Sequence, residues 1–161
     1  MVACPDSKPL LIMIQNQDYI MRQVKVLTDF LIQILTKKNE GAYEEAEQLI
    51  DRSIAEVFED TNQAFSKLSL KQTAEALKDE AQDGKVILAM ANILFEKIEL
   101  VPEEQKQKAS LQTLLLYKKA LSYSNTAFAI EDIHKMNGLE KKFKGAPELA
   151  EITEILKTNE L

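Results

Sequence analysis

Apolar residues recur three and four positions apart over residues 18–38, which is the spacing of one buried face of an α-helix. A second stripe with the same spacing covers residues 42–60. The connection at 39–41 is short, so the two helices are predicted to be antiparallel neighbours. Their predicted buried stripes are Ile20, Val24, Leu27, Phe30, Leu31, Ile34 and Leu35 on the first helix and Tyr43, Ala46, Leu49, Ile50, Ile54, Val57 and Phe58 on the second.

The rest of the chain predicts further helices, one of them apolar on every side. A capping box at residues 69–72 opens a helix that ends near residue 82, before Asp83-Gly84. Residues 86–98 are apolar all round, so this helix is expected at the centre of the fold. Pro102 starts a helix that reaches Leu121, or ends earlier if Ser110 caps a new one. Short C-terminal helices are expected at about 127–136, stopped by Asn137-Gly138, and at about 147–157.

Composition supports an all-α fold built from antiparallel helical hairpins. The chain has 4 glycines and 4 prolines, too few for the many tight turns of a β-sandwich or barrel. Alanine, leucine, glutamate, lysine and glutamine, all good helix formers, dominate instead. The pattern predicts about six to seven helices. Residues 13–161 are expected to form a single domain, and residues 1–12 a loose N-terminal extension.

Charge and hydropathy exclude several classes of partner. The formal net charge of −6 repels phosphate, so nucleic-acid binding is not expected. The chain has no run of roughly 18 or more apolar residues, so no membrane span is expected. Cys4 is the single cysteine, which rules out an internal disulfide and favours a reducing, cytoplasmic location. Acidic residues prevail over 40–60 and basic ones over 18–38, so the two helices should attract modestly.

Two short motifs carry a resemblance to a known repeat. Residues 41–46, Gly-Ala-Tyr-Glu-Glu-Ala, are similar to the turn and second helix of a tetratricopeptide repeat, and residues 117–121 resemble the end of that helix. The resemblance implies a tetratricopeptide-like superhelix or right-handed helical array over about residues 18–121. An ordinary irregular bundle is the alternative, because Ile34 and Ser53 depart from the small residues usual at their aligned positions.

Residues 13–22 give a narrower resemblance. They are similar to the opening of an uncharacterised bacterial family of small Firmicute proteins that have a degenerate tetratricopeptide-like fold and no assigned function. If the resemblance holds, Met13 is the natural start of the chain rather than Met1.

Candidate catalytic and metal-binding chemistry is sparse. His134 is the only histidine, so any catalytic arrangement with a histidine base would have to use it. Glu131 and His134 have the Glu-x-x-His spacing of di-iron bundles, but those sites need a second such motif. Cys4 has only Lys8 nearby to lower its pKa. The basic cluster at 140–144 is isolated and fits a linker between helices.

No catalytic, metal or cofactor site is therefore predicted. The acidic face around Glu44 lacks the alternating oxygen ligands and central glycine of a calcium loop. The four glycines are scattered, each at an expected helix boundary, so they form no phosphate-binding loop.

The predicted function is a non-catalytic interaction module that binds a protein or peptide, or a second copy of itself. In tetratricopeptide-like arrays the first helix of each hairpin lines a binding groove. When residues 41–46 are aligned with the repeat at Gly41, Leu31 and Leu35 fall on the groove side of the first helix. The alternative is a small-molecule-binding bundle or an enzyme with a pocket between helices. An interaction module should expose a contiguous apolar patch, whereas a small-molecule binder should contain a pocket with converging polar groups.

Overall fold

The computed structural model confirms the all-α prediction with seven α-helices. It describes residues 7–57, 65–79, 83–123 and 126–159, with side chains in the first helix from Gln17 onward, and none of these residues forms a strand. The elements are α1 (Ser7–Asn39), α2 (Tyr43–Val57), the 3-10 turn η1 (Phe65–Lys67), α3 (Leu70–Asp79), α4 (Gly84–Lys97), α5 (Glu103–Leu121), α6 (Ile130–Lys142) and α7 (Pro147–Asn159).

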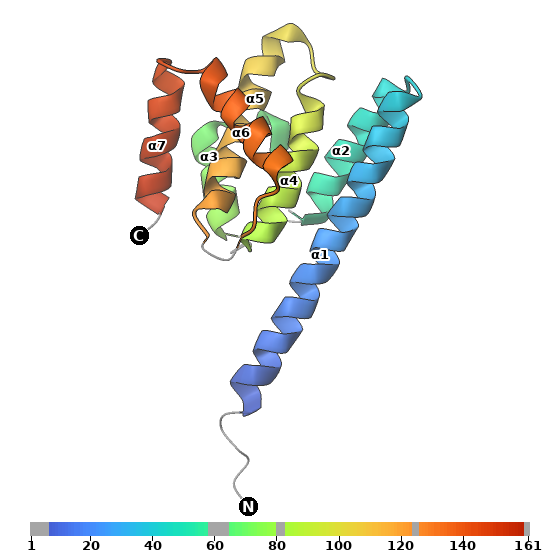
Figure 1. Ribbon diagram of the computed structural model, residues 1–161, viewed down its shortest axis with the longest axis vertical. Helices are drawn as coiled ribbons and strands as arrows, with labels where there is room; N and C mark the ends of the chain where they lie inside the picture. The colour runs from blue at the N-terminus through green and yellow to red at the C-terminus, as the bar shows by residue number, and fades with distance from the viewer. Residues whose placement is uncertain (1–6, 58–64, 80–82, 124–125, 160–161) are drawn as a thin grey trace, which may run out of the picture.

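Helices α1 and α2 form the predicted antiparallel hairpin (Figure 1). Gly41 turns the chain at a φ of 79°, a conformation that costs glycine little because it has no Cβ. The Ala42 N–H donates to the Lys37 carbonyl at 2.9 Å and closes the end of α1. Lys37 also pairs with Glu45 of α2 at 3.0 Å, but both side chains are exposed, so this ion pair contributes little.

Helix α4 lies at the centre of the fold, as its apolar sequence predicted. It makes its most extensive contacts with α5 and also packs against α1 (Figure 1). Seven of its apolar side chains are buried, namely Val86, Ile87, Leu88, Met90, Ala91, Ile93 and Leu94. The helix therefore supplies core residues shared by the α1–α2 and α4–α5 hairpins.

Two details at the start of α4 differ from the prediction. Asp83 and Gly84, expected to end the preceding helix, instead begin α4, and the Asp83 Oδ1 accepts from the Lys85 N–H at 2.8 Å. Gly84 is buried against Tyr123 and Thr126, so close that a Cβ would overlap them. Glycine is required at this position because the start of α4 approaches the segment at Tyr123 and Thr126 closely, and not because a helix ends here. The predicted end of α3 near residue 82 lies outside the described residues.

The capping box of α3 is confirmed. The Ser69 N–H donates to Gln72 Oε1 at 2.9 Å, and the Gln72 N–H donates to Ser69 Oγ at 3.1 Å. Helix α5 is continuous from Glu103, with Ser110 buried inside it. A separate helix start at Ser110 is therefore excluded.

The C-terminal helices correct one predicted boundary. Asn137-Gly138 was expected to stop a helix, yet α6 continues through it to Lys142. Glycine inside a helix costs about 1 kcal/mol relative to alanine. Met136, Leu139 and Phe143 are buried on both sides of this glycine, and their burial outweighs that cost. Helix α7 begins at Pro147 as predicted.

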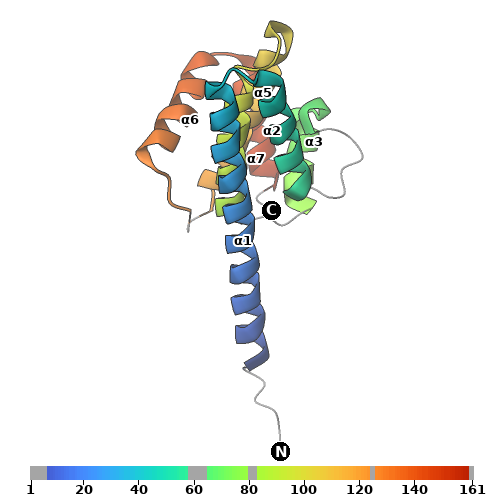
Figure 2. The same ribbon diagram turned by 90° about the vertical axis from the view of Figure 1, so that its right-hand side faces the viewer.

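The N-terminus of α1 gives a second correction. Residues 7–12, predicted to be part of a loose extension, belong to α1, which starts at Ser7 rather than near Asp18. At 1.5 Å per residue this helix is roughly 50 Å long. Its first half extends beyond all the other helices, as the two perpendicular views show (Figures 1 and 2).

Candidate helix-binding surface

Helix α1 exposes large apolar side chains along both flanks of its buried stripe. We call these residues the α1 surface, and their exposed fractions are 61% for Tyr19, 68% for Met21, 42% for Val26, 58% for Ile32 and 39% for Leu35. Leu27 and Ile34, on the buried stripe between the flanks, are fully covered. Helices α2 and α4 cover only part of α1. The apolar sector of α1 is therefore wider than the surface that these two helices cover.

A groove of about 290 Å³ follows one flank of α1. Its walls come from α1 and α4, with Ala127 at one edge. We call it the α1–α4 groove, and its lining residues are Val24, Leu27, Thr28, Leu31, Lys85, Leu88, Ala89, Asn92 and Ala127. Most of these side chains are apolar, and Lys85 is the one charged residue of the set.

The two residues predicted to bind a partner lie on or beside this groove. Leu31 lines it and is half-buried. Leu35 lies one helical turn further along α1 and is exposed. The sequence pattern placed both on the buried stripe of α1, but the structure leaves them at its margin. Met21 and Ile32, which the prediction did not include, add exposed apolar area on the same helix.

Beyond the groove, an ion-pair cluster joins α1 to α4. The Lys38 ammonium donates to Glu96 at 2.7 Å and to Glu99 at 3.0 Å. Burial acts to lower the pKa of Lys38, but the hydrogen bonds and charges of Glu96 and Glu99 outweigh it, so the pKa lies above its ordinary value. The cluster therefore links the C-terminal ends of α1 and α4.

A hydrogen bond at the back of the groove ties α4 to α5. The buried Tyr117 hydroxyl donates to Asn92 Oδ1 at 2.6 Å. Burial raises the pKa of Tyr117, with smaller contributions from the carboxylates of Asp132 and Glu96. This bond orients Asn92, the amide group in the lining of the groove.

The other candidate residues do not come together. His134 and Glu131 are both exposed on α6, whereas Asp132 accepts the Ala129 N–H at 3.0 Å and caps that helix. In the described ranges, no three His, Cys, Asp or Glu side chains are close enough to share a metal ion. Cys4 lies outside the described residues. None of the described helices combines the length and the apolar character needed to cross a bilayer.

The chain was compared with protein-family models, with curated proteins and with solved structures, and none of them matches it.

Proposed function

We propose that this chain is a non-catalytic helical interaction module that self-associates through α1. In the proposed dimer, the α1–α4 groove and α1 surface of one copy pack against α1 of a second copy. The observation that carries the proposal is that the first half of α1 extends beyond the body, next to an apolar groove on the same helix (Figure 2).

The physics of helix formation supports this proposal. A helical segment without tertiary packing is marginal in water when it is shorter than about 12–15 residues. The projecting part of α1 contains Leu10-Leu11-Ile12-Met13-Ile14, five consecutive apolar residues. Tyr19 and Met21, next along the helix, are each more than half exposed. Burying such a segment against another helix would stabilise both, since apolar burial contributes about 25 cal/mol per Å².

A second copy is the occupant that fits these observations best. The groove is open, mostly apolar and bordered by helices, which is the geometry that accepts an amphipathic helix. The α1 surface is itself such a helix face. Because a two-fold dimer pairs the same patch from both copies, a single apolar helix with an adjacent groove can satisfy both halves of the interface.

The proposal also draws on the resemblance to tetratricopeptide-like arrays. Helices α1 and α4 are the first members of the α1–α2 and α4–α5 hairpins, and they contact each other. In such arrays the first helices of successive hairpins line the binding groove. We extend the proposal accordingly: this protein uses the same layer for association.

The test is the oligomeric state of the full chain, measured by sedimentation velocity over a concentration series. We expect a reversible dimer. Leu35→Glu and Ile32→Glu should each weaken it by roughly tenfold or more, because each would place a charge in an apolar interface. Leu121→Glu is the matched control, since Leu121 is 53% exposed at the end of α5 and does not line the α1–α4 groove. It should leave the dimer unchanged.

Two results would overturn the proposal. One is a monomer at every concentration, which would leave α1 free for a different partner. The other is a dimer that tolerates both α1 substitutions, which would place the interface on another face. Circular dichroism of each variant checks that the helical fold is kept.

A further inference from the structure

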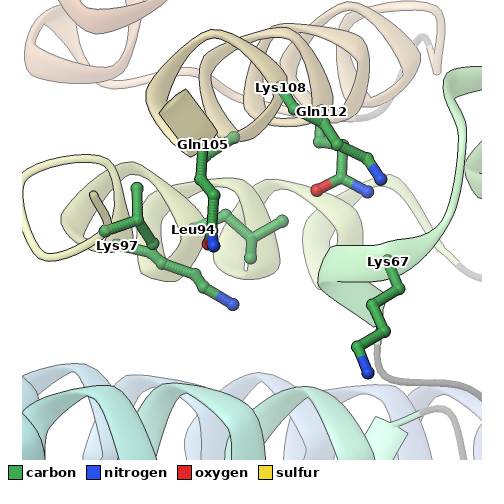
Figure 3. Close-up of a pocket in the computed structure, with 8 residues that line it drawn as sticks. Lys67, Leu94, Lys97, Gln105, Lys108 and Gln112 are labelled. Atoms are coloured by element: carbon green, nitrogen blue, oxygen red, sulfur yellow. The ribbon is translucent and has the colours of Figure 1, made fainter. Parts of the chain in front are cut away.

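A second pocket, of about 380 Å³, lies on the other side of α4. Figure 3 shows Lys97, Gln105 and Lys67 reaching toward one open space between α4, α5 and η1. We call this site the lysine pocket, and its lining residues are Lys67, Leu94, Lys97, Val101, Gln105, Lys108, Ala109 and Gln112. Its volume is within the range of small-molecule sites, roughly 300–1,000 Å³.

A buried amide builds one wall of the lysine pocket. Gln112 of α5 is 3% exposed, and its Nε2 lies within hydrogen-bonding distance of the Phe65 carbonyl at 3.0 Å and the Leu68 carbonyl at 3.1 Å. It also lies 3.2 Å from the Thr73 hydroxyl. These contacts fasten η1 to α5 and so hold Lys67 at the rim. The protein's own hydrogen bonds therefore hold this wall of the pocket in place.

The lysine pocket carries an excess of positive charge in a protein of net charge −6. The side chain of Lys97 is only 8% exposed, and among the described residues its ammonium reaches one acceptor, Asp51 Oδ1 at 3.2 Å. No ion pair within the described ranges holds Lys67 or Lys108. Within the described ranges, the three pocket lysines therefore have one carboxylate partner, Asp51, and it pairs with Lys97 alone.

We infer that the lysine pocket binds a small organic anion with a doubly charged head, either a phosphate ester or a dicarboxylate. The ammonium groups of Lys97, Lys67 and Lys108 would hold the head, because charge-assisted hydrogen bonds to such oxygens are among the strongest available. The Gln105 amide adds a neutral donor. Leu94, Val101 and Ala109 offer an apolar wall to the carbon skeleton of the ligand.

This inference goes beyond self-association and is independent of it. The two sites use different α4 residues: Leu88, Ala89 and Asn92 border the α1–α4 groove, whereas Leu94 and Lys97 border the lysine pocket.

Isothermal titration calorimetry of the full chain tests the inference with three probes: inorganic phosphate, glycerol 3-phosphate and succinate, each at a fixed ionic strength set with chloride. We expect saturable binding of at least one organic probe. Preference between glycerol 3-phosphate and succinate identifies the head group, and tighter binding of an organic probe than of phosphate shows that the apolar wall contributes.

Lysine substitutions supply the controls. Lys108→Gln and Lys67→Gln should each weaken binding by roughly tenfold, the loss expected for one charge-assisted hydrogen bond. Both residues are exposed, so their replacement should not disturb folding. Lys106→Gln is the matched control on α5, because Lys106 pairs with Glu103 and does not line the pocket. No saturable binding of either organic probe, or an equal loss with Lys106→Gln, would overturn the inference.

Discussion

Helices α1 and α4 contact each other but bury their apolar residues to very different extents. Most apolar side chains of helix α4 are buried, with Ile87, Met90 and Ile93 fully covered, and its exposed edge at the groove carries the polar residues Lys85 and Asn92. Helix α1 has covered residues along one stripe and large exposed apolar residues on both flanks of it. The apolar side chains of a central helix are already buried within the chain. Exposed apolar side chains on a helix at the edge of the fold are the expected place for a partner to bind.

The largest predicted effect is a loss of stability on replacing a buried isoleucine of α4 by alanine. The same replacement of an exposed isoleucine of α1 is the comparison. Ile93→Ala in α4 should lower the free energy of unfolding by about 3 kcal/mol, because it leaves a cavity in a packed core. Ile32→Ala in α1 should change it by less than about 0.5 kcal/mol in the monomer, since Ile32 is 58% exposed. Urea denaturation at low protein concentration measures both values.

The same pair of variants also tests the role of the α1 surface. At concentrations where the protein associates, Ile32→Ala should show a larger loss than in the monomer, because association adds stability only to the folded state. A loss that is equal for Ile32 and Ile93 in the monomer would contradict the contrast between the two helices.

Helix identity was predictable from the sequence because local signals and tertiary packing agree. Residues 86–98 could be placed in the core from hydrophobicity alone, and the capping box at Ser69 and Gln72 has local geometry that its sequence specifies. Gly138 was misassigned because burial on both sides of it overrides its low helix propensity. The role of Gly84 depends on Tyr123 and Thr126, which are distant in sequence.

The candidate sites were less predictable, because they depend on how the helices are placed. Leu31 and Leu35 were selected through a resemblance, but the exposure of Met21 and Ile32 depends on how far α2 and α4 extend along α1. The apolar run at residues 10–14 was a usable signal that the helix begins early. The lysine pocket joins Lys67, Lys97 and Lys108 from three separate elements, and no spacing along the chain indicates it.

The next prediction concerns the attachment of α4 to α5. Tyr117→Phe removes the hydrogen bond to Asn92 and should lower the free energy of unfolding by about 1 kcal/mol at neutral pH. The effect should be smaller than that of Ile93→Ala, because Asn92 is half-buried and water can replace the lost hydroxyl. Denaturant titration of the variant measures it. A loss as large as that for Ile93→Ala would mean that the bond also fixes the packing.

The raised pKa of Tyr117 predicts how the free energy of unfolding changes at alkaline pH. Burial raises its pKa in the folded state above the ordinary value of 10.0, so the unfolded chain releases this proton first as the pH rises. The stabilising contribution is complete below pH 10 and is lost progressively above it. Tyr117→Phe should therefore show a shallower decline of stability above pH 10 than the unaltered protein. An unchanged slope would contradict the burial of the phenol.

An effect smaller than that of Tyr117→Phe is predicted for the contact between α1 and α4, and two adjacent lysines test it. Lys38→Gln removes the pair with Glu96 and Glu99, and should lower the free energy of unfolding by about 0.5–1 kcal/mol, because Lys38 and Glu96 are largely shielded from solvent. Lys37→Gln is the control: its partners Glu40 and Glu45 belong to the α1–α2 hairpin and are exposed, so the loss should be smaller.

The pH dependence of this pair separates electrostatic from packing effects. The folded-state pKa of Lys38 lies above its ordinary value of 10.5, so its contribution is complete below that pH and disappears as the pH rises through the folded-state pKa. The difference between Lys38→Gln and the unaltered protein should therefore shrink at high pH and in high salt. A difference that persists under both conditions would mean that the aliphatic part of Lys38, rather than its charge, holds α1 against α4.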